Sequence, residues 1–250
     1  MFNLEGRVAV VTGSSAGLGS YMAKALARQG AKVALLARRM EKLEEIAQEI
    51  RAEGGEALPV VCDVTKSEDV KAAAAKVVEV YGTVDILVNN AGTGLPSSII
   101  DMPDERWEAI FSLNIDGVMR CTREFGRIMV EKGYGRVINI ASVLGVGGLP
   151  ETKSIAYHAS KGAVVNFTRA CAAEWALTGV TCNCILPGFF PSEINPPERL
   201  ATYGFVVPRT PMKRPGRIDE LDSTVVYLAA DESTYVTGVI LPCDGGWTCV

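Results

Sequence analysis

The sequence lacks any long uninterrupted apolar stretch. A helix that crosses a bilayer needs about 20 consecutive apolar residues, and no run in the chain approaches that length. The N-terminal residues Met1–Arg7 also lack the apolar core of a secretory signal. We therefore expect a cytoplasmic protein without a membrane span.

The chain also has little net charge and no dense cluster of basic residues. Its 25 Lys and Arg residues stand against 29 Asp and Glu, a net charge of −4, which argues against a nucleic-acid surface. Hydrophobic residues make up 48% and charged residues 22%, an ordinary balance for a soluble protein. No internal repeat or low-complexity stretch divides the 250 residues, so we expect a single domain, 1–250.

Metal-binding side chains are few and poorly spaced. The seven cysteines include no C-x-x-C pair, and Cys182 and Cys184 lack the further Cys or His partners of a zinc site. We expect no metal, mostly buried thiols in a reducing compartment, and an exposed, reactive candidate at Cys249. His158 is the only histidine. It follows Tyr157 on an expected helix and points about 100° away from it, so we interpret it as structural.

Short apolar runs alternate with amphipathic segments along the chain. Near-continuous apolar runs are typical of parallel strands buried on both faces. Between them, apolar residues recur at helical spacing in 43–50 and 70–81, and Gly54 and Gly82 follow in the C-terminal position that glycine favours. The pattern predicts an α/β protein with an open, doubly wound sheet and helices on both faces. The expected strands are 7–11, 32–36, 59–62, 84–88, 136–140, 180–186 and 239–241.

A glycine-rich turn follows the first expected strand. Residues Thr12–Gly19 space their glycines as G-x-x-x-G-x-G, not as the standard G-x-G-x-x-G fingerprint. The physical reason is shared, because glycine permits a tight turn and close backbone approach. The helix that follows, through Arg28, presents free N–H groups to a pyrophosphate. A strand-to-helix turn without a ligand is the alternative.

The end of the second strand indicates which nucleotide binds. An acidic residue there would hold the ribose hydroxyls, but the sequence has Ala37-Arg38-Arg39. Guanidinium groups bind a 2′-phosphate well, so we predict a preference for NADP(H), with NAD(H) possible. The alternative is that Arg38 only stacks on adenine and Arg39 is solvated. Asp63 and Val64 are expected near adenine, and Asn89–Gly92 near the switch point of the sheet.

Tyr157 and Lys161 stand four positions apart, which on a helix places them on one face. A phenol ordinarily titrates near ~10 and is a poor acid and base at neutral pH. A neighbouring cation favours the phenolate, so we expect Lys161 to lower the pKa of Tyr157. The spacing alone is weak evidence, and it gains weight only beside a cofactor site.

Five motifs stand in one order, and together they closely resemble the short-chain dehydrogenase/reductase family. They are Gly13-x-x-x-Gly17-x-Gly19, Asn89-Asn90-Ala91-Gly92, Ser142, Tyr157-x-x-x-Lys161 and Pro187-Gly188. The resemblance covers essentially the whole chain, from about residue 5 to Asp244-Gly245-Gly246. It implies a single-domain, seven-stranded Rossmann-type parallel sheet, and a homotetramer (or dimer) built through long helices near 104–131 and 155–178.

The resemblance also implies the chemistry. Tyr157 would protonate the alkoxide in reduction and act as base in oxidation, with hydride from the cofactor. Lys161 would lower the pKa of Tyr157 and hold the nicotinamide ribose. Ser142 would hydrogen-bond the carbonyl oxygen, and Asn114 would position a water in a proton relay. The cofactor-binding residues expected are Gly13, Ser14, Ser15, Gly17, Leu18, Gly19, Arg38, Arg39, Asp63, Val64, Asn90, Ala91, Gly92, Tyr157, Lys161, Pro187, Gly188, Phe190 and Ser192.

The substrate is less constrained. Segment 143–154, with its polar Glu151-Thr152-Lys153, looks like that of gluconate 5-dehydrogenases and related polyol or sugar-acid enzymes of the family. Apolar residues in the same region equally suit an acyl chain or a steroid, so a 3-oxoacyl thioester reductase and a hydroxysteroid dehydrogenase stay open, as does a non-catalytic nucleotide-binding protein. The proline-rich segment 189–215 predicts a substrate lid. Substrate contacts are expected from Ser142, Leu144, Gly148, Tyr157, Phe189 and Ile194.

Overall fold

The computed structural model describes residues 2–192, 200 and 203–250. One sheet has seven strands in the order β3-β2-β1-β4-β5-β6-β7. All neighbouring strands run parallel. The predicted seven-stranded Rossmann-type sheet is confirmed, with strand ends that differ by a few residues. The strands are β1 (Val8–Thr12), β2 (Lys32–Ala37), β3 (Glu56–Val61), β4 (Ile86–Asn89), β5 (Gly135–Ile140), β6 (Val180–Pro187) and β7 (Ile240–Cys243).

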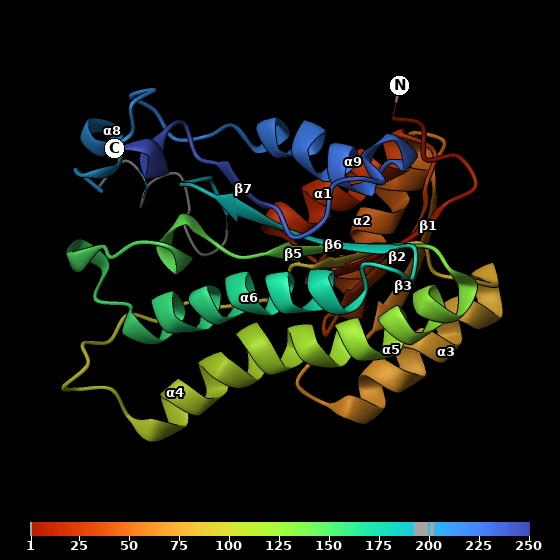
Figure 1. The fold of residues 1–250 in the computed structure, drawn as a ribbon, viewed down its shortest axis with the longest axis horizontal. Coiled ribbons are helices and arrows are strands. Elements are labelled where there is room, and N and C mark those ends of the chain that lie inside the picture. Colours follow the sequence, from red (N-terminus) through yellow and green to blue (C-terminus); the bar gives the residue numbers. More distant parts are fainter. Residues whose placement is uncertain (1, 193–199, 201–202) are drawn as a thin grey trace.

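Helices cover both faces of the sheet (Figure 1). α1, α2 and α9 lie on one face, and α3, α5 and α6 lie on the other (Figure 1). Gly54 and Gly82, which follow α2 and α3, have φ values of +86° and +79°, so the predicted glycine helix ends are confirmed. The helices are α1 (Gly17–Arg28), α2 (Met40–Ala52), α3 (Ser67–Tyr81), α4 (Asp104–Phe111), α5 (Gly117–Lys132), α6 (Ile155–Glu174), α8 (Val206–Arg209) and α9 (Asp222–Ala229).

The central strands send alternate side chains into two apolar cores. Val11 and Leu35 belong to the core beneath α1 and α9, whereas Val10 and Leu36 belong to the core beneath α3 and α5. All four side chains are fully buried. Because neither face of the sheet meets water here, these strands have no polar side, which explains their continuous apolar sequences. The thiols follow the expected pattern, and Cys249 is exposed.

The two long helices differ from their predicted extents in different ways. The segment 104–132 is one helical run, but a π-helix at Ser112–Asp116 joins α4 to α5. α6 ends at Glu174, so the prediction of a helix to residue 178 is wrong. Thr178 causes the early end, because its N–H and its hydroxyl both bond to the carbonyl of Trp175, at 2.9 and 2.8 Å. Such local bonds compete with helix continuation.

An ionic cluster closes the amino ends of the central strands. Asp85 is 3% exposed. Its carboxylate accepts the N–H of Val8 at 2.8 Å, pairs with Lys132, and lies 3.8 Å from Arg7. A buried carboxylate is thus surrounded by two cations and a backbone donor, which offset the cost of its burial.

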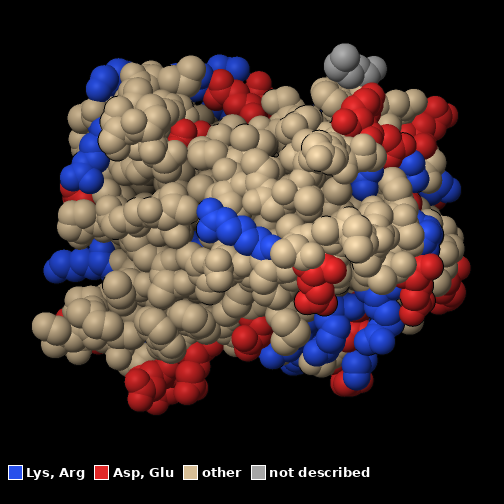
Figure 2. Space-filling view, viewed as in Figure 1, with Lys and Arg blue, Asp and Glu red and all other residues tan. Residues whose placement is uncertain are grey.

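The same cluster continues around the ring of Tyr134. Its hydroxyl donates to Asp231 at 2.6 Å, and the Arg7 and Arg136 guanidinium groups lie 4.1 and 4.5 Å from the ring centre. Figure 2 shows acidic and basic side chains intermixed most densely at this end of the molecule. We call this set the amino-end cluster: Arg7, Asp85, Lys132, Tyr134, Arg136 and Asp231.

Candidate active site

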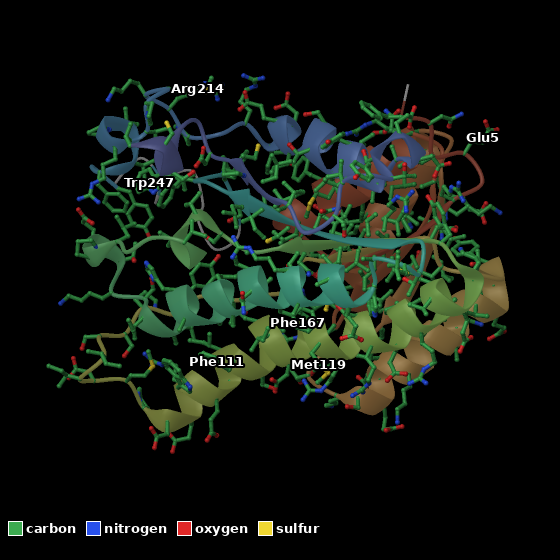
Figure 3. All side chains as sticks on the ribbon, in the orientation of Figure 1. Glu5, Phe111, Met119, Phe167, Arg214 and Trp247 are labelled. Carbon is green, nitrogen blue, oxygen red and sulfur yellow. The ribbon has the colours of Figure 1, made fainter. Side chains whose placement is uncertain are left out.

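One large cleft lies across the carboxyl ends of the strands. Its volume is about 880 Å³, and its lining comes from the segments that follow β1 to β6 and from the start of α6. Figure 3 shows Trp247 at this end of the molecule and Glu5, which precedes β1, at the opposite end. β1 and β4 are neighbours although β2 and β3 lie between them in the sequence. The cleft therefore sits at the topological switch point, as predicted.

The glycine-rich turn opens the N-terminus of α1 beside this cleft. Gly13 and Gly17 have φ values of +65° and +57°, a region that favours glycine. A Cβ on Gly13 would also lie 2.8 Å from the Cα of Ala91. Ala16 gives α1 no side-chain cap, and the first turn has no acidic residue. Ala16, Gly17 and Leu18 line the cleft, so the turn fits an anionic pyrophosphate.

Thr12 fixes the two central strands to each other, and the sequence analysis did not single it out. Its hydroxyl oxygen accepts the N–H groups of Asn90 and Ala91 at 3.0 and 3.1 Å. Asn90 Nδ2 donates back to the Thr12 carbonyl at 3.0 Å. This exchange holds the turn after β4 against the glycine-rich turn. A hydroxyl at the last position of an otherwise apolar strand was the available signal.

Charged side chains mark the far end of the cleft, beyond β2 and β3. Arg38 and Arg39 both line it, and Arg39 Nη2 donates to Ser15 Oγ at 3.2 Å. Asp63 accepts the N–H and hydroxyl of Thr65 at 3.0 and 2.7 Å. Burial alone would raise the pKa of Asp63, but these hydrogen bonds and the charge of Arg38 lower it. This end therefore holds two cations near an ionised carboxylate.

Ser142, Tyr157 and Lys161 meet at the base of the cleft. Ser142 follows β5, and its hydroxyl accepts the N–H of Leu144 at 3.1 Å. Ser142 is also near enough to Tyr157 to lower the pKa of the phenol. The Lys161 ammonium lies 5.8 Å from the centre of the Tyr157 ring and donates to the carbonyl of Ile140 at 2.7 Å. The fold thus brings together the hydroxyl, phenol and ammonium that the sequence analysis singled out.

Burial shifts the pKa values of the phenol and the ammonium. It raises the pKa of Tyr157, and the neighbouring Ser142 hydroxyl opposes only part of that change. Lys161 is 4% exposed, and burial lowers its pKa from 10.5 to about 8. The expectation that Lys161 lowers the pKa of Tyr157 is wrong for the protein alone. Desolvation, which disfavours the charged form of both groups, is the largest cause of each shift.

Asn114 lies in the π-helix and is fully buried. Its amide accepts the N–H of Thr93 at 2.8 Å and donates to the Thr93 carbonyl at 2.9 Å and to Ser160 Oγ at 3.0 Å. It does not line the cleft. A Cβ on Gly92 would lie 3.2 Å from Asn114 Oδ1 and 3.3 Å from Lys161 Nζ, so amide and ammonium are neighbours. The predicted water relay through Asn114 stays a prediction.

The remaining wall of the cleft combines apolar side chains with hydroxyls. Leu144 and Phe189 line it as predicted, and Tyr203, which the sequence analysis missed, lines it too. Phe189 packs on Trp247 with ring centres 4.9 Å apart. One predicted substrate contact does not line the cleft, because Gly148 is exposed and lies outside its lining. The predicted contact at Ile194 lies outside the described residues and stays a prediction.

A family model described as short chain dehydrogenase matches residues 7–201. The chain belongs to the short-chain dehydrogenase/reductase family. As a member, it is an NAD(P)-dependent oxidoreductase that interconverts an alcohol and a carbonyl compound, and the alternative of a non-catalytic nucleotide-binding protein is set aside. Within the described parts of this dehydrogenase, no helix combines the length and apolarity needed to cross a bilayer.

Relatives with different names match over nearly their whole length. Galactitol 2-dehydrogenase (L-tagatose-forming) of Cereibacter sphaeroides is 39% identical, over 99% of this chain and 97% of the relative. The 3-oxoacyl-[acyl-carrier-protein] reductase FabG of Thermotoga maritima is 32% identical, over 97% and 98%. A crystal structure of a gluconate 5-dehydrogenase from Burkholderia cenocepacia, in complex with NADP and tartrate, superposes with a TM-score of 0.94 at 36% identity, covering 100% and 98%.

Most of the cofactor-binding residues predicted for this dehydrogenase line the cleft. Ser14 and Gly19 are buried behind its surface, where Gly19 packs closely on Gly13 and Asn90. Gly188 lines it at a close approach, because a Cβ there would lie 2.8 Å from the Cα of Asp244. The others that line it are Gly13, Ser15, Gly17, Leu18, Arg38, Arg39, Asp63, Val64, Asn90, Ala91, Gly92, Tyr157, Lys161, Pro187, Phe190 and Ser192.

Proposed function

We propose that this enzyme uses NADP(H) to interconvert a secondary alcohol and a ketone on a polyol or sugar acid, with Tyr157 as the acid and base. The observation that carries the proposal is that Ser142, Tyr157 and Lys161, the last one helical turn from Tyr157, all line the base of one cleft that fits a dinucleotide. A bound nicotinamide supplies or accepts the hydride.

The side chains at the base of the cleft move and stabilise the proton. In reduction, Tyr157 donates its proton to the carbonyl oxygen as negative charge develops there, and in oxidation it removes the proton from the alcohol. Ser142 donates a hydrogen bond to the same oxygen. Lys161 holds the ribose hydroxyls of the nicotinamide nucleotide and places a positive charge near the phenol. Burial raises the pKa of Tyr157 in the protein alone, and the positive charge of Lys161 favours the phenolate against that shift.

Arg38 and Arg39 support the preference for NADP(H) over NAD(H). Both line the nucleotide end of the cleft, and Arg39 already contacts Ser15. A charge-assisted hydrogen bond contributes roughly 1.5–3 kcal/mol, or about 10- to 150-fold in affinity. Two solved relatives, named as gluconate 5-dehydrogenases, contain NADP.

The nucleotide preference is tested by the dissociation constants of NADPH and NADH, measured by fluorescence. We expect NADPH to bind at least tenfold more tightly to the wild type, and Arg38→Ala with Arg39→Ala to remove most of that difference without weakening NADH. Lys42→Ala is the control, because Lys42 lies in the first turn of α2, three residues after Arg39, and does not line the cleft. Wild-type constants within threefold of each other would contradict the preference.

Hydroxyl-bearing side chains in the wall support a polyol or sugar-acid substrate. Thr152, Ser154 and Ser192 line the cleft beside Tyr157. The galactitol and gluconate dehydrogenases among the relatives act on such compounds, as their names state. Leu144 and Phe189 support a second candidate, a 3-oxoacyl thioester or a steroid, because they provide an apolar wall. The lid at 189–215 stays a prediction, since residues 193–199 and 201–202 lie outside the described part.

The substrate class is tested by following NADPH absorbance with 5-ketogluconate, L-tagatose, a 3-oxoacyl thioester and a keto-steroid. We expect the two sugar derivatives to react faster than the apolar ketones. If the thioester or the steroid reacts more than tenfold faster, the polyol or sugar-acid assignment is wrong and the second candidate replaces it.

We also propose that the enzyme is a homotetramer or dimer that pairs through the helical runs at 104–132 and 155–174. Figure 2 shows few charged side chains over the middle of this face, where α5 and α6 lie in Figure 1. Light scattering after gel filtration should give a multiple of 26.7 kDa. A single species of that mass would contradict the assembly.

A further inference from the structure

Thr152 and Ser154 form a hydroxyl pair in the wall of the cleft. Both line it together with Tyr157, and their hydroxyl oxygens lie 2.8 Å apart. Lys153, between them, has a φ of +42°, a conformation that is unfavourable for a residue with a Cβ. An unfavourable backbone kink that brings two hydroxyls together in the wall of the cleft that Tyr157 also lines indicates a function for the pair.

The segment that carries this pair is held from two sides. On one side, the N–H of Ser97 donates to the carbonyl of Lys153 at 2.6 Å, and Ser97 forms a parallel bridge with Ser154. On the other side, Arg209 at the end of α8 pairs with Glu151 at 2.5 Å. These contacts join the pair to the turn after β4 and to the segment after β6. Its position relative to Tyr157 is therefore fixed by the walls of the cleft.

The hydrogen bonds within the pair determine what it can recognise. Either hydroxyl can donate across the 2.8 Å contact. The arrangement that satisfies both contacts of Thr152 has its hydroxyl donating to the carbonyl of Leu149 at 3.2 Å and Ser154 donating to Thr152. His158 Nδ1 lies 2.8 Å from the carbonyl of Ser154 and therefore carries the proton that it donates there. In this arrangement both hydroxyl protons are used within the protein. The His158 N–H also lies 3.3 Å from Ser154 Oγ, so one lone pair on each hydroxyl oxygen remains for a ligand. The pair is an acceptor, and it suits a ligand that donates.

The charges around the cleft favour a neutral donor over a carboxylate. Among the lining residues that the structure describes, the cations are Arg38 and Arg39 at the nucleotide end and Lys161 at the base. Lys153, between the two hydroxyl residues, is exposed and does not line the cleft. The next charge on this segment is the carboxylate of Glu151, which pairs with Arg209. A substrate carboxylate at the pair would face oxygen lone pairs and find no hydrogen-bond donor there. An alcohol O–H would donate a hydrogen bond to one of those lone pairs.

We propose that Thr152 and Ser154 determine specificity by accepting hydrogen bonds from hydroxyls next to the reacting carbon of a neutral polyol or its ketose. This inference rests on the proposed function and narrows it, because it selects neutral polyols over sugar acids. His158 holds the backbone of Ser154 and so positions the pair. That contact gives the lone histidine the structural role that the sequence suggested.

The test compares NADP-linked oxidation of galactitol, gluconate and cyclohexanol by the full-length enzyme. The variants are Thr152→Val, which keeps the shape of the side chain, and Ser154→Ala. Ser98→Ala is the matched control, because Ser98 lies on the neighbouring turn and does not line the cleft. We expect each variant to lower kcat/KM for galactitol by about 3- to 10-fold, mainly through KM, and to change cyclohexanol by less than twofold. We also expect the wild type to prefer galactitol to gluconate.

Two results would overturn the inference while the proposed function stands. One is an equal loss for galactitol and cyclohexanol in both variants, which would assign the pair a purely structural role. The other is a wild-type preference for gluconate. If the wild type oxidises cyclohexanol but neither galactitol nor gluconate, the proposed substrate class fails and the inference fails with it. The wild-type assays alone reveal that case, before any variant is made.

Discussion

Charged side chains are buried at both ends of the sheet, but the two ends differ in how completely those charges are paired. At the amino ends, Asp85 has two cations and a backbone N–H around its carboxylate, and Arg136, 1% exposed, donates to the carbonyl of Gly135 at 2.9 Å. At the carboxyl ends, the ammonium of Lys161 donates to a neutral carbonyl, and its pKa is about 8. Complete pairing stabilises the first end, whereas incomplete pairing leaves the second able to bind and to react.

The largest effect on stability is expected from breaking the amino-end cluster at Asp85. Asp85→Asn keeps an acceptor for the N–H of Val8 but leaves Lys132 and Arg7 without their buried partner. We expect a loss of about 3 kcal/mol in the free energy of unfolding, measured by urea denaturation. The activity of the folded fraction should stay within twofold of the wild type. A loss below 1 kcal/mol would show that the cluster is not the main electrostatic support of the fold.

Lys161→Met should raise the free energy of unfolding of the protein without cofactor, whereas Asp85→Asn should lower it. The fall of the Lys161 pKa from 10.5 to about 8 means that the folded state carries a cost of roughly 3 kcal/mol while the ammonium is charged. Loss of the bond to Ile140 offsets part of the gain. We therefore expect a variant that is 1–2 kcal/mol more stable at pH 7 and has little activity.

The pH dependence of this difference follows from the sign of the shift. Below pH 8, Lys161 is protonated in both the folded and the unfolded state, and the folded wild type carries the full cost of its buried charge. Between pH 8 and 10.5 the folded state is neutral while the unfolded chain is still charged, so the wild type gains stability relative to Lys161→Met. Urea titrations at pH 7, 8.5 and 10 should show the difference shrinking. If the difference in the free energy of unfolding did not change with pH, the buried charge of Lys161 would not be what lowers the stability of the wild type.

The smallest effect is expected from Tyr134→Phe, which removes one hydrogen bond of the amino-end cluster and keeps the ring. Burial alone would raise the pKa of Asp231, but the hydrogen bonds from Tyr134 and Arg7 lower it. Asp231 is largely exposed, so we expect a loss of only about 0.5–1 kcal/mol at pH 7. The loss should fade as the pH drops and Asp231 is protonated. A loss that persists unchanged at pH 3 would assign the effect to packing.

The sequence predicts the fold well because the fold depends on repeated local signals. Seven apolar runs and the glycines after α2 and α3 give the order and type of the elements without long-range information. The error at the end of α6 has a local cause that periodicity does not report, namely the bonds from Thr178 to Trp175. The π-helix at Ser112–Asp116 is likewise invisible in the spacing of apolar residues.

The site is predictable only where a motif fixes a residue type. Ser142, Tyr157 and Lys161 lie together as expected. The direction of the Tyr157 pKa shift was missed because it depends on burial, which residue spacing does not measure. Tyr203 lies within the segment 189–215 that was predicted as a lid, but no motif there singled it out as a lining residue. It lines the cleft and stacks on Phe205, with ring centres 5.1 Å apart.

The most direct test of the account measures Tyr157→Phe beside the wild type, with NADP⁺ and galactitol as substrates and the dissociation constant of NADPH measured separately. The account predicts a kcat lower by about 10²- to 10⁴-fold and NADPH binding within threefold of the wild type. Turnover within tenfold of the wild type would contradict it, because the proton would then not pass through Tyr157.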